Sequence, residues 1–178
     1  MIIGGVAGGA STAARLRRLD EQAEIILFEK GEYISYANCG LPYYIGGVIE
    51  ERERLFVQTP ESFKARFNIE VRIKSEVKAI EPENKQVVIK DWATGKTYRE
   101  SFDKLVLSPG AEPVLPPWEG IRTEGIFTLR NVADTDRIKA WAGRQEVKKA
   151  VVVGAGFIGL EMAENLHELG IQLSLIHI

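Results

Sequence analysis

Two glycine-rich turns, one near each end of the chain, constrain the fold more than any other feature. The second turn, GAGFIG at residues 154–159, follows the apolar run at 151–153 and precedes a stretch of helical composition. It fits the pattern G-x-G-x-x-G in the strand–turn–helix setting that the pattern requires. Gly154 allows the tight bend, Gly156 leaves room for a pyrophosphate, and Gly159 lets helix and strand pack closely. We therefore predict dinucleotide binding here, with a plain strand–helix turn as the alternative.

The first turn, GGVAGG at residues 4–9, departs from that pattern, because Val6 stands where the middle glycine belongs. A valine there crowds a pyrophosphate, so this turn alone is weaker evidence. Glu29 strengthens it, since it ends the next apolar strand 29 − 4 = 25 residues after the first glycine. That is close to where an acidic side chain binds ribose hydroxyls. An ordinary charge at the end of a strand is the alternative for Glu29.

The alternation of apolar segments and turn signals predicts an α/β fold with a doubly wound parallel sheet and a small antiparallel hairpin. A loop followed by a short helix is expected at residues 33–47. Strands are expected at residues 1–3, 24–29, 70–77, 104–107, 150–153 and 171–178, the hairpin at 85–91 and 97–102, and helices at 10–19, 61–67, 134–141 and 160–169.

Three segments organise the chain. We expect residues 1–112 to form a first nucleotide-binding domain, the proline-rich residues 113–149 to connect onward, and residues 150–178 to begin a second domain. One β–turn–α–β unit cannot complete a doubly wound sheet, so we expect a piece of a longer protein, truncated at the C-terminus. The first strand, at residues 1–3, is short and points to lost residues at the N-terminus as well.

Composition excludes several classes of function. The hydrophobic fraction of 45% and charged fraction of 27% are those of an ordinary globular protein. A net charge of −2 gives no reason to expect nucleic acid or an anionic membrane as partner. The sequence lacks a signal peptide and any apolar run of about 20 residues, and no cluster of metal ligands is evident. With one cysteine, a disulfide scaffold is excluded, and we expect a cytoplasmic protein.

Cys39 is that single cysteine, in the segment SYANCGLPYY at residues 35–44. A lone sulfur between two nucleotide turns suggests electrons passing from one nucleotide through another to a thiol. Because no intramolecular disulfide can form, a redox cycle needs the sulfur of a small molecule or an oxygen, as a sulfenic acid. A buried structural cysteine is the alternative.

The residues around this cysteine carry a family resemblance. The segment at 35–44 and the turn at 4–9 resemble the single-cysteine branch of the pyridine nucleotide-disulfide oxidoreductases, above all the coenzyme A-disulfide reductases. NADH oxidases, NADH peroxidases and persulfide reductases are close relatives within that branch. SPGA at 108–111, TLRN at 128–131 and DTD at 134–136 match further family segments, so that the resemblance covers essentially the whole chain.

The resemblance implies a Rossmann-like FAD-binding domain interrupted by an NAD(P)H-binding domain, in a protein that is a homodimer at full length. Electrons pass from NAD(P)H to FAD and then to Cys39, which is held in a mixed disulfide with coenzyme A, and the partner is a small-molecule thiol or disulfide. An oxidase or peroxidase that uses a Cys39 sulfenic acid stays open, as does an electron-transfer flavoprotein with an idle cysteine. The residue that separates NADH from NADPH lies near or beyond Ile178.

The resemblance also implies site residues, with Cys39 as the catalytic one. On the first helix Ser11, Arg15 and Arg18 share a face, which we assign to the phosphates of CoA, with Ser35 and Asn38 near the sulfur. A solvated arginine face is the alternative, and Arg66 is a weaker candidate. Cofactor contacts are implied for Gly4, Gly5, Val6, Ala7, Gly9, Glu29, Lys30, Asn38, Val77, Ser108, Pro109, Gly110, Gly154, Gly156, Phe157, Ile158, Gly159 and Glu161.

Overall fold

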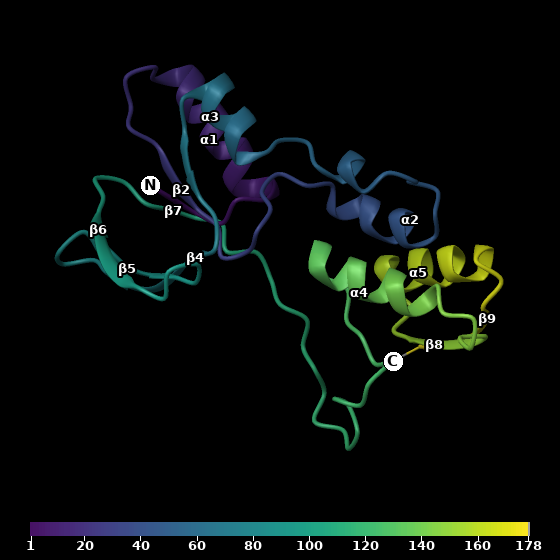
Figure 1. Cartoon of the computed structure of the whole chain (residues 1–178). Helices are drawn as coiled ribbons and strands as arrows, with labels where there is room; N and C mark the ends of the chain where they lie inside the picture. Colours follow the sequence, from purple (N-terminus) through teal and green to yellow (C-terminus); the bar gives the residue numbers. More distant parts are fainter. Residues whose placement is uncertain (178) are drawn as a thin grey trace. The chain divides into compact units, whose positions relative to one another are not determined.

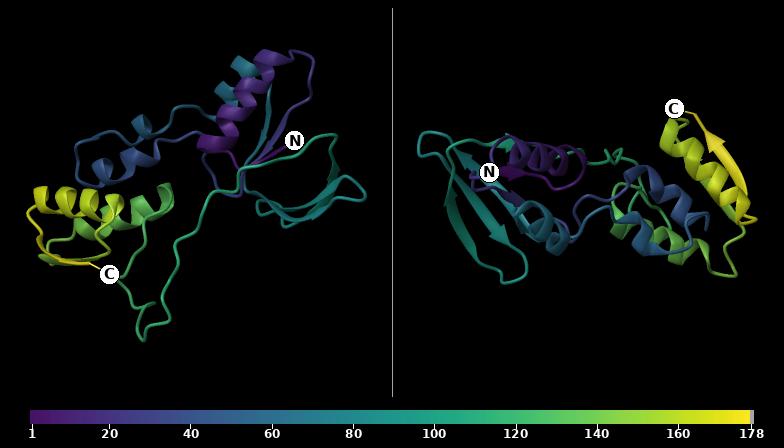
Figure 2. Two further views of the ribbon diagram at one scale, coloured as in Figure 1. Left: turned by 180° about the vertical axis from the view of Figure 1, so that it is seen from behind. Right: turned by 90° about the horizontal axis from the view of Figure 1, so that it is seen from above.

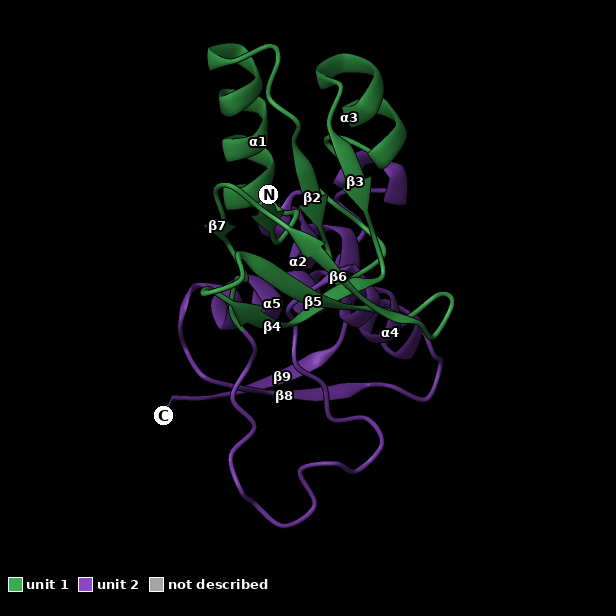
Figure 3. Cartoon of the chain, turned by 90° about the vertical axis from the view of Figure 1, so that its left-hand side faces the viewer, with its two compact units in different colours: residues 1–36, 56–111 green, residues 37–55, 112–178 purple. Residues whose placement is uncertain are grey.

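The chain divides into two compact units, which are coloured separately in Figure 3. The computed structural model describes residues 1–177. Unit 1 comprises residues 1–36 and 56–111, and unit 2 comprises residues 37–55 and 112–178. Cys39 and the rest of residues 37–55 therefore belong to unit 2, a long-range grouping that no local sequence pattern indicates.

Unit 1 is built on a parallel sheet of four short strands in the order β3-β2-β1-β7. The central strand β1 is flanked in register by its two neighbours, because Ile2 pairs with Leu27 on one side and with Val106 on the other. The four strands are β1 (Ile2–Ile3), β2 (Ile26–Phe28), β3 (Glu70–Arg72) and β7 (Val106–Leu107).

Two helices cover one face of this sheet, and Figure 1 shows them together above β2. They are α1 (Ala7–Leu19) and α3 (Pro60–Phe67). The small residues Ala10 and Ala13 bring α1 close to the sheet, where they pack in one core cluster with Leu27 and with Phe63 of α3. Burial of these apolar side chains supplies the main stabilisation of the unit.

A three-stranded antiparallel sheet packs on the other side, where Phe28 of β2 meets Val87 and Ile89 in a second cluster. Its strands are β4 (Ser75–Glu81), β5 (Gln86–Asp91) and β6 (Thr97–Ser101), in sequence order. Unit 1 thus consists of helices, parallel sheet and antiparallel sheet in three layers.

The expected strand at residues 70–77 is wrong as a single element. The chain turns at Lys74, whose φ of +52° is left-handed, and this turn ends β3 and starts β4. The N–H of Lys74 donates to Gly31 O, and the next N–H, of Ser75, donates to Glu29 O. The segment therefore passes from the parallel sheet to the antiparallel one, and the expected hairpin is the outer part of a three-stranded sheet.

Unit 2 contains one parallel pair of strands, β8 (Lys149–Val153) and β9 (Gln172–Ile176), joined by α5 (Phe157–Glu168). The expected strand at 171–178 is β9, and Ile178 lies outside the described residues. Helix α4 (Val132–Ala142) lies with α5 on one side of the pair (Figure 1). Residues 112–131 contain no helix or strand and run as a long loop, green in Figure 2.

The cysteine segment folds into short helical pieces within unit 2. A 3₁₀ turn, Asn38–Gly40, leads directly into α2 (Leu41–Ile45), and a second 3₁₀ turn, Arg52–Leu55, follows. Ile45 of α2 packs in one core cluster with Ile138 of α4 and Met162 of α5. Across residues 1–177, no helix has the length and apolar character needed to cross a bilayer.

Candidate nucleotide and thiol sites

The first glycine turn is held against the edge of the parallel sheet. Gly4 has a φ of +95°, a conformation that L side chains rarely adopt, and its N–H donates to Phe28 O at 2.8 Å. A Cβ on Gly4 would lie 1.9 Å from Ser108 O, and one on Gly9 would lie 1.7 Å from Gly4 O. Helix α1 can therefore start directly against the turn only because Gly9 has no side chain.

Glu29 lies at the end of β2 and ties this turn to the rest of the sheet edge. Its carboxylate is buried, accepting an N–H bond from Gly5 at 2.8 Å and one from Gly31 at 2.7 Å. A carboxylate has about four lone-pair sites, so these two bonds leave capacity for further donors. Ser35 joins the same cluster, since its N–H donates to Gly5 O at 2.9 Å.

Ser108 completes the cluster from the end of β7. Its N–H donates to Ile3 O at 2.8 Å, and its side chain is the nearest group to Gly8 of α1. The turn at residues 4–9, Glu29 and Ser108 thus meet beyond the carboxyl ends of β1, β2 and β7. In open α/β sheets this edge is where nucleotides bind.

Helix α1 starts with no side-chain cap at Val6, so its first backbone N–H groups point out of the turn without a side-chain acceptor. Such a helix N-terminus favours an anion. The tight glycine turn and the uncapped helix start are compatible with the pyrophosphate site that the sequence predicts, which stays a prediction.

Within unit 1, two of the implied cofactor residues lie outside this cluster. Val77 is in β4, where it pairs with Ile89 and packs against the core of the antiparallel sheet. Lys30 follows Glu29, but its side chain is exposed. Their roles stay predictions.

The helix face expected to bind phosphates is open to solvent. Ser11, Arg15 and Arg18 of α1 are all exposed. The guanidinium of Arg18 lies 5.9 Å from the ring centroid of Phe67, and that of Arg66 lies 5.2 Å from the same ring. Phe67 thereby brings Arg66 of α3 next to the face on α1, a proximity that the sequence does not reveal.

The second glycine turn, in unit 2, repeats the geometry of the first. Gly154 has a φ of +104°, and a Cβ on Gly159 would lie 1.9 Å from Gly154 O. Gly156 has open space where a side chain would stand, and it begins α5 without a side-chain cap. Phe157 and Ile158 are exposed beside this turn, and Glu161 of α5 is half-buried.

Cys39 is exposed and lies in the middle of the 3₁₀ turn Asn38–Gly40. Beside it, Asn38 Oδ1 is buried and has no hydrogen-bond partner within the described part of the chain. A buried acceptor without a donor calls for an explanation, and a donor from a bound molecule provides one. Ser35, just before this turn, adopts a φ of +46°, a strained conformation of the kind that concentrates at functional sites.

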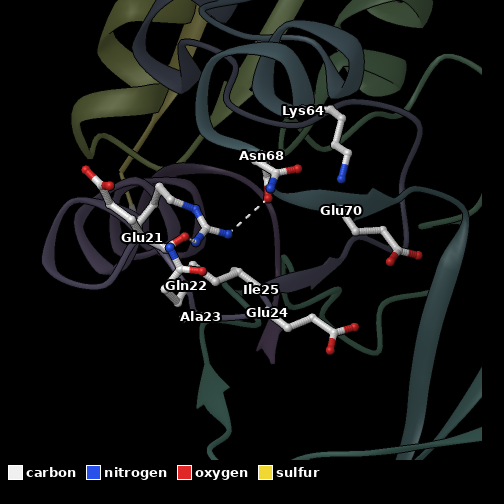
Figure 4. A pocket seen from close by; sticks show the side chains of 9 residues that line it. Glu21, Gln22, Ala23, Glu24, Ile25, Lys64, Asn68 and Glu70 are labelled. Carbon is white, nitrogen blue, oxygen red and sulfur yellow. Dashed lines mark hydrogen bonds between the residues drawn. The ribbon is translucent and has the colours of Figure 1, made fainter.

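A shallow polar pocket of about 290 Å³ lies at the far end of α1 from the glycine turn (Figure 4). The guanidinium of Arg17 is already used there, since it donates to Phe67 O at 2.7 Å and to Asn68 O at 3.0 Å. These bonds join the end of α1 to the end of α3, so we interpret the pocket as structural.

The contacts that hold the cysteine segment were not anticipated from the sequence. Arg52 forms an ion pair with Asp136 of α4 at 2.7 Å, and the ammonium of Lys139 reaches the backbone of α2. These pairs join residues more than eighty positions apart, and no local pattern marks them.

The comparison with known families decides the assignment. The family described as pyridine nucleotide-disulphide oxidoreductase matches residues 1–178. The chain belongs to this family. It is an oxidoreductase family whose members use FAD and a nicotinamide dinucleotide, in agreement with the two glycine turns described above.

Similar proteins within the pyridine nucleotide-disulphide oxidoreductases include a coenzyme A disulfide reductase of Staphylococcus haemolyticus, 44% identical over 99% of this chain and 40% of that protein. The structure of reduced CoADR-RHD from Bacillus anthracis is 57% identical, with a TM-score of 0.97 over 99% of this chain and 32% of that one. An NAD-dependent persulfide reductase from A. fulgidus is 38% identical, with a TM-score of 0.93 over 98% and 33% of the two chains. The chain thus spans about 40% of the length of the curated relatives.

Proposed function

We propose that this chain is part of an FAD-dependent NAD(P)H:CoA-disulfide reductase, or of a closely related persulfide reductase, with Cys39 as the reactive sulfur. The observation that carries the proposal is the exposed single cysteine in a 3₁₀ turn beside the unpartnered acceptor of Asn38. Similar proteins named for CoA disulfide and persulfide reduction support it. The proposal includes a cytoplasmic homodimer at full length.

The residues at the sheet edge of unit 1 fit FAD. Gly4 and Gly9 let the turn close tightly against Ser108 and the start of α1, whose first N–H groups have no side-chain cap. Glu29 retains acceptor capacity for ribose hydroxyls. Pro109 and Gly110, after Ser108, would contact the same group. When bound, FAD supplies the two-electron relay between the nicotinamide and the sulfur.

The turn at residues 154–159 would hold NAD(P)H, with its pyrophosphate at the uncapped start of α5. Gly156 leaves open space at that point. Glu161, on the first turns of the helix, is the polar side chain nearest in sequence to the expected ligand.

The thiol chemistry belongs to Cys39 itself. As a thiolate, Cys39 Sγ attacks one sulfur of CoA disulfide, so that a new S–S bond forms and one CoA thiolate leaves and takes a proton. Two electrons from NAD(P)H and a second proton then break the mixed disulfide and release the second CoA. The sum consumes one NAD(P)H, one proton and one CoA disulfide per two CoA thiols.

We assign recognition of the substrate phosphates to arginine side chains on α1 and α3. Ser11, Arg15 and Arg18 face solvent on α1 and would bind the phosphates of CoA, with Arg66 beside them across Phe67. Arginine suits this role, because its guanidinium binds phosphate with two parallel hydrogen bonds. Ser35 and Asn38 would contact the substrate close to the sulfur.

The mass of the intact full-length protein before and after dithiothreitol tests the proposal. We expect the loss of one CoA, mapped to Cys39, and the absence of that loss in a Cys39→Ser variant. A mass loss of one oxygen would contradict the proposal and would instead indicate an oxidase or peroxidase that cycles through a sulfenic acid at Cys39. Full NAD(P)H turnover in Cys39→Ser would instead show an electron-transfer flavoprotein with an idle cysteine.

A further inference from the structure

Helix α2 follows Cys39 after a single glycine and continues directly from the 3₁₀ turn that contains the sulfur. It has five residues, Leu41–Ile45, and so is far too short to be stable alone. Leu41 and Ile45 are buried, at 2% and 1% exposure. Its order must therefore come from the elements packed on it, which in unit 2 are α4 and α5.

Lys139 of α4 reaches the C-terminal end of this short helix. Its ammonium donates to Tyr44 O, and it lies 3.4 Å from Ile45 O. The same ammonium is 4.4 Å from the centroid of the Tyr44 ring. The carbonyl of Tyr44 also accepts the backbone N–H of Gly47 at 3.3 Å, so the ammonium adds a charged donor at this helix end, where a cation complements the helix dipole.

Lys139 differs from an ordinary surface lysine in its burial and in the pKa of its ammonium. Lys139 is half-buried, and burial lowers the pKa of its ammonium because the charged form loses water. A lysine that gives up hydration needs strong acceptors, and here they are two backbone carbonyls and an aromatic face.

Other contacts also hold this segment, and one of them reaches Gly46, the residue that caps the C-terminal end of α2. The ion pair of Arg52 with Asp136 joins the second 3₁₀ turn to α4. The side chain of Asn165, on α5, lies against Gly46, where a Cβ would come within 2.3 Å of Oδ1. Among the described residues, Lys139 supplies the side-chain cation at the carbonyls of Tyr44 and Ile45.

We propose that Lys139 is a positioning residue, which holds the helix after Cys39 in place through its ammonium on the carbonyls of Tyr44 and Ile45. It acts through α2 and does not touch the reacting sulfur. The inference rests on the proposed function, because it assigns Lys139 a role at the sulfur proposed to be reactive. Through the side chain of Lys139, helix α4 of unit 2 keeps the cysteine segment ordered.

The test compares four variants of the full-length, FAD-loaded enzyme: Lys139→Met, Lys139→Arg, Lys148→Met and Cys39→Ser. Methionine keeps the length of the side chain without its charge, and arginine restores a cation. Lys148 is an exposed lysine of unit 2 whose side chain makes no hydrogen bond or ion pair within residues 1–177. The readouts are amide hydrogen exchange across residues 38–47 and steady-state turnover of NAD(P)H with CoA disulfide.

We expect Lys139→Met to speed amide exchange in α2 by about tenfold and to lower kcat by about tenfold, since a charged hydrogen bond to a partly buried carbonyl is lost. The KM for NAD(P)H should not change. Lys139→Arg should recover both readouts to within about twofold, and Lys148→Met should match the wild type. A general loss of stability would instead speed exchange in every element equally.

Two results would overturn the inference: kcat and α2 exchange in Lys139→Met that equal the wild type, or equal losses in the Met and Arg variants. If Lys139→Met does not fold, Lys139→Gln replaces it, because glutamine keeps a donor without the charge. Undiminished turnover in Cys39→Ser would overturn the proposed function, while the exchange data would still decide whether Lys139 orders α2.

Discussion

At the scale of single residues, the backbone contact inside each glycine turn is the least tolerant feature of the chain. A Cβ at position 9 would overlap the carbonyl oxygen of Gly4, only 1.7 Å away, and neither group can move without shifting α1 from the sheet. We expect Gly9→Ala to destabilise unit 1 by about 3 kcal/mol, as overpacking does. Thermal and urea unfolding of the protein without added FAD measure this loss.

The neighbouring glycine provides the control. A Cβ on Gly8 would lie 3.3 Å from Ser108 Oγ, a side-chain atom that can give way, and Gly8 is exposed within α1. Gly8→Ala should change stability by less than about 1 kcal/mol, because alanine also favours the helix. Equal losses in both variants would contradict the backbone clash as the cause.

At the scale of elements, α4 depends on its first turn. Asn131 Oδ1 accepts the N–H of Asp134 at 2.9 Å, while the Asp134 carboxylate accepts the N–H of Arg130 at 2.9 Å. We expect Asn131→Ala to lower the unfolding free energy by about 1 kcal/mol, because the capping acceptor is removed. Urea unfolding measures the change, and it should be accompanied by faster amide exchange at the start of α4.

The matched control for this cap is Asn131→Ser. Serine also accepts a hydrogen bond from the third residue of a helix, so we expect stability to stay within about 0.5 kcal/mol of the wild type. A serine variant as unstable as the alanine variant would show that the amide contributes by some contact other than the cap.

The elements also show what the sequence can predict. Helices and strands with a clear apolar pattern are confirmed, including both strand–turn–helix units, because glycine spacing and burial on the sheet face are local properties. The break at Lys74 was missed, since apolar residues continue on both sides of it and only its left-handed φ ends the strand. The packing of residues 37–55 with unit 2 was missed as well, because it depends on contacts such as Lys139 with Tyr44, 95 positions apart.

At the candidate sites too, the sequence predicts what local patterns determine and misses what tertiary contacts determine. The sequence makes Glu29 a candidate by its place after a strand. It does not show that the carboxylate accepts the N–H groups of Gly5 and Gly31, because bonds to backbone groups leave no residue pattern. Arg18 and Arg66 were separate candidates, and only the tertiary position of Phe67 brings them together.

At the scale of the whole molecule, one sheet face of unit 2 presents exposed apolar side chains. Helices α4 and α5 lie on one side of β8 and β9 (Figure 1), where Ala150 and Val152 pack in their core cluster. Val151 and Val153 alternate along β8 with 60% and 48% exposure, and Val153 is in register with Ile176 at 47%. Phe157, at the start of α5, is 89% exposed. Large contiguous apolar patches are rare on a stable monomer, so exposed side chains such as those of Val151, Val153 and Ile176 favour association.

We therefore expect the chain of residues 1–178 to associate reversibly with rising concentration, in the presence of dithiothreitol so that Cys39 plays no part. The double variant Val151→Thr/Val153→Thr keeps β-branched side chains for the strand but makes this face polar, and should shift association to about tenfold higher concentration. Val48→Thr/Val114→Thr removes two exposed valines elsewhere in unit 2, at 69% and 88% exposure, and should change nothing. Light scattering across a dilution series measures all three proteins. Equal association in all of them would show that the exposed valines of β8 do not drive it, whereas loss in the first variant alone would assign the association to this sheet.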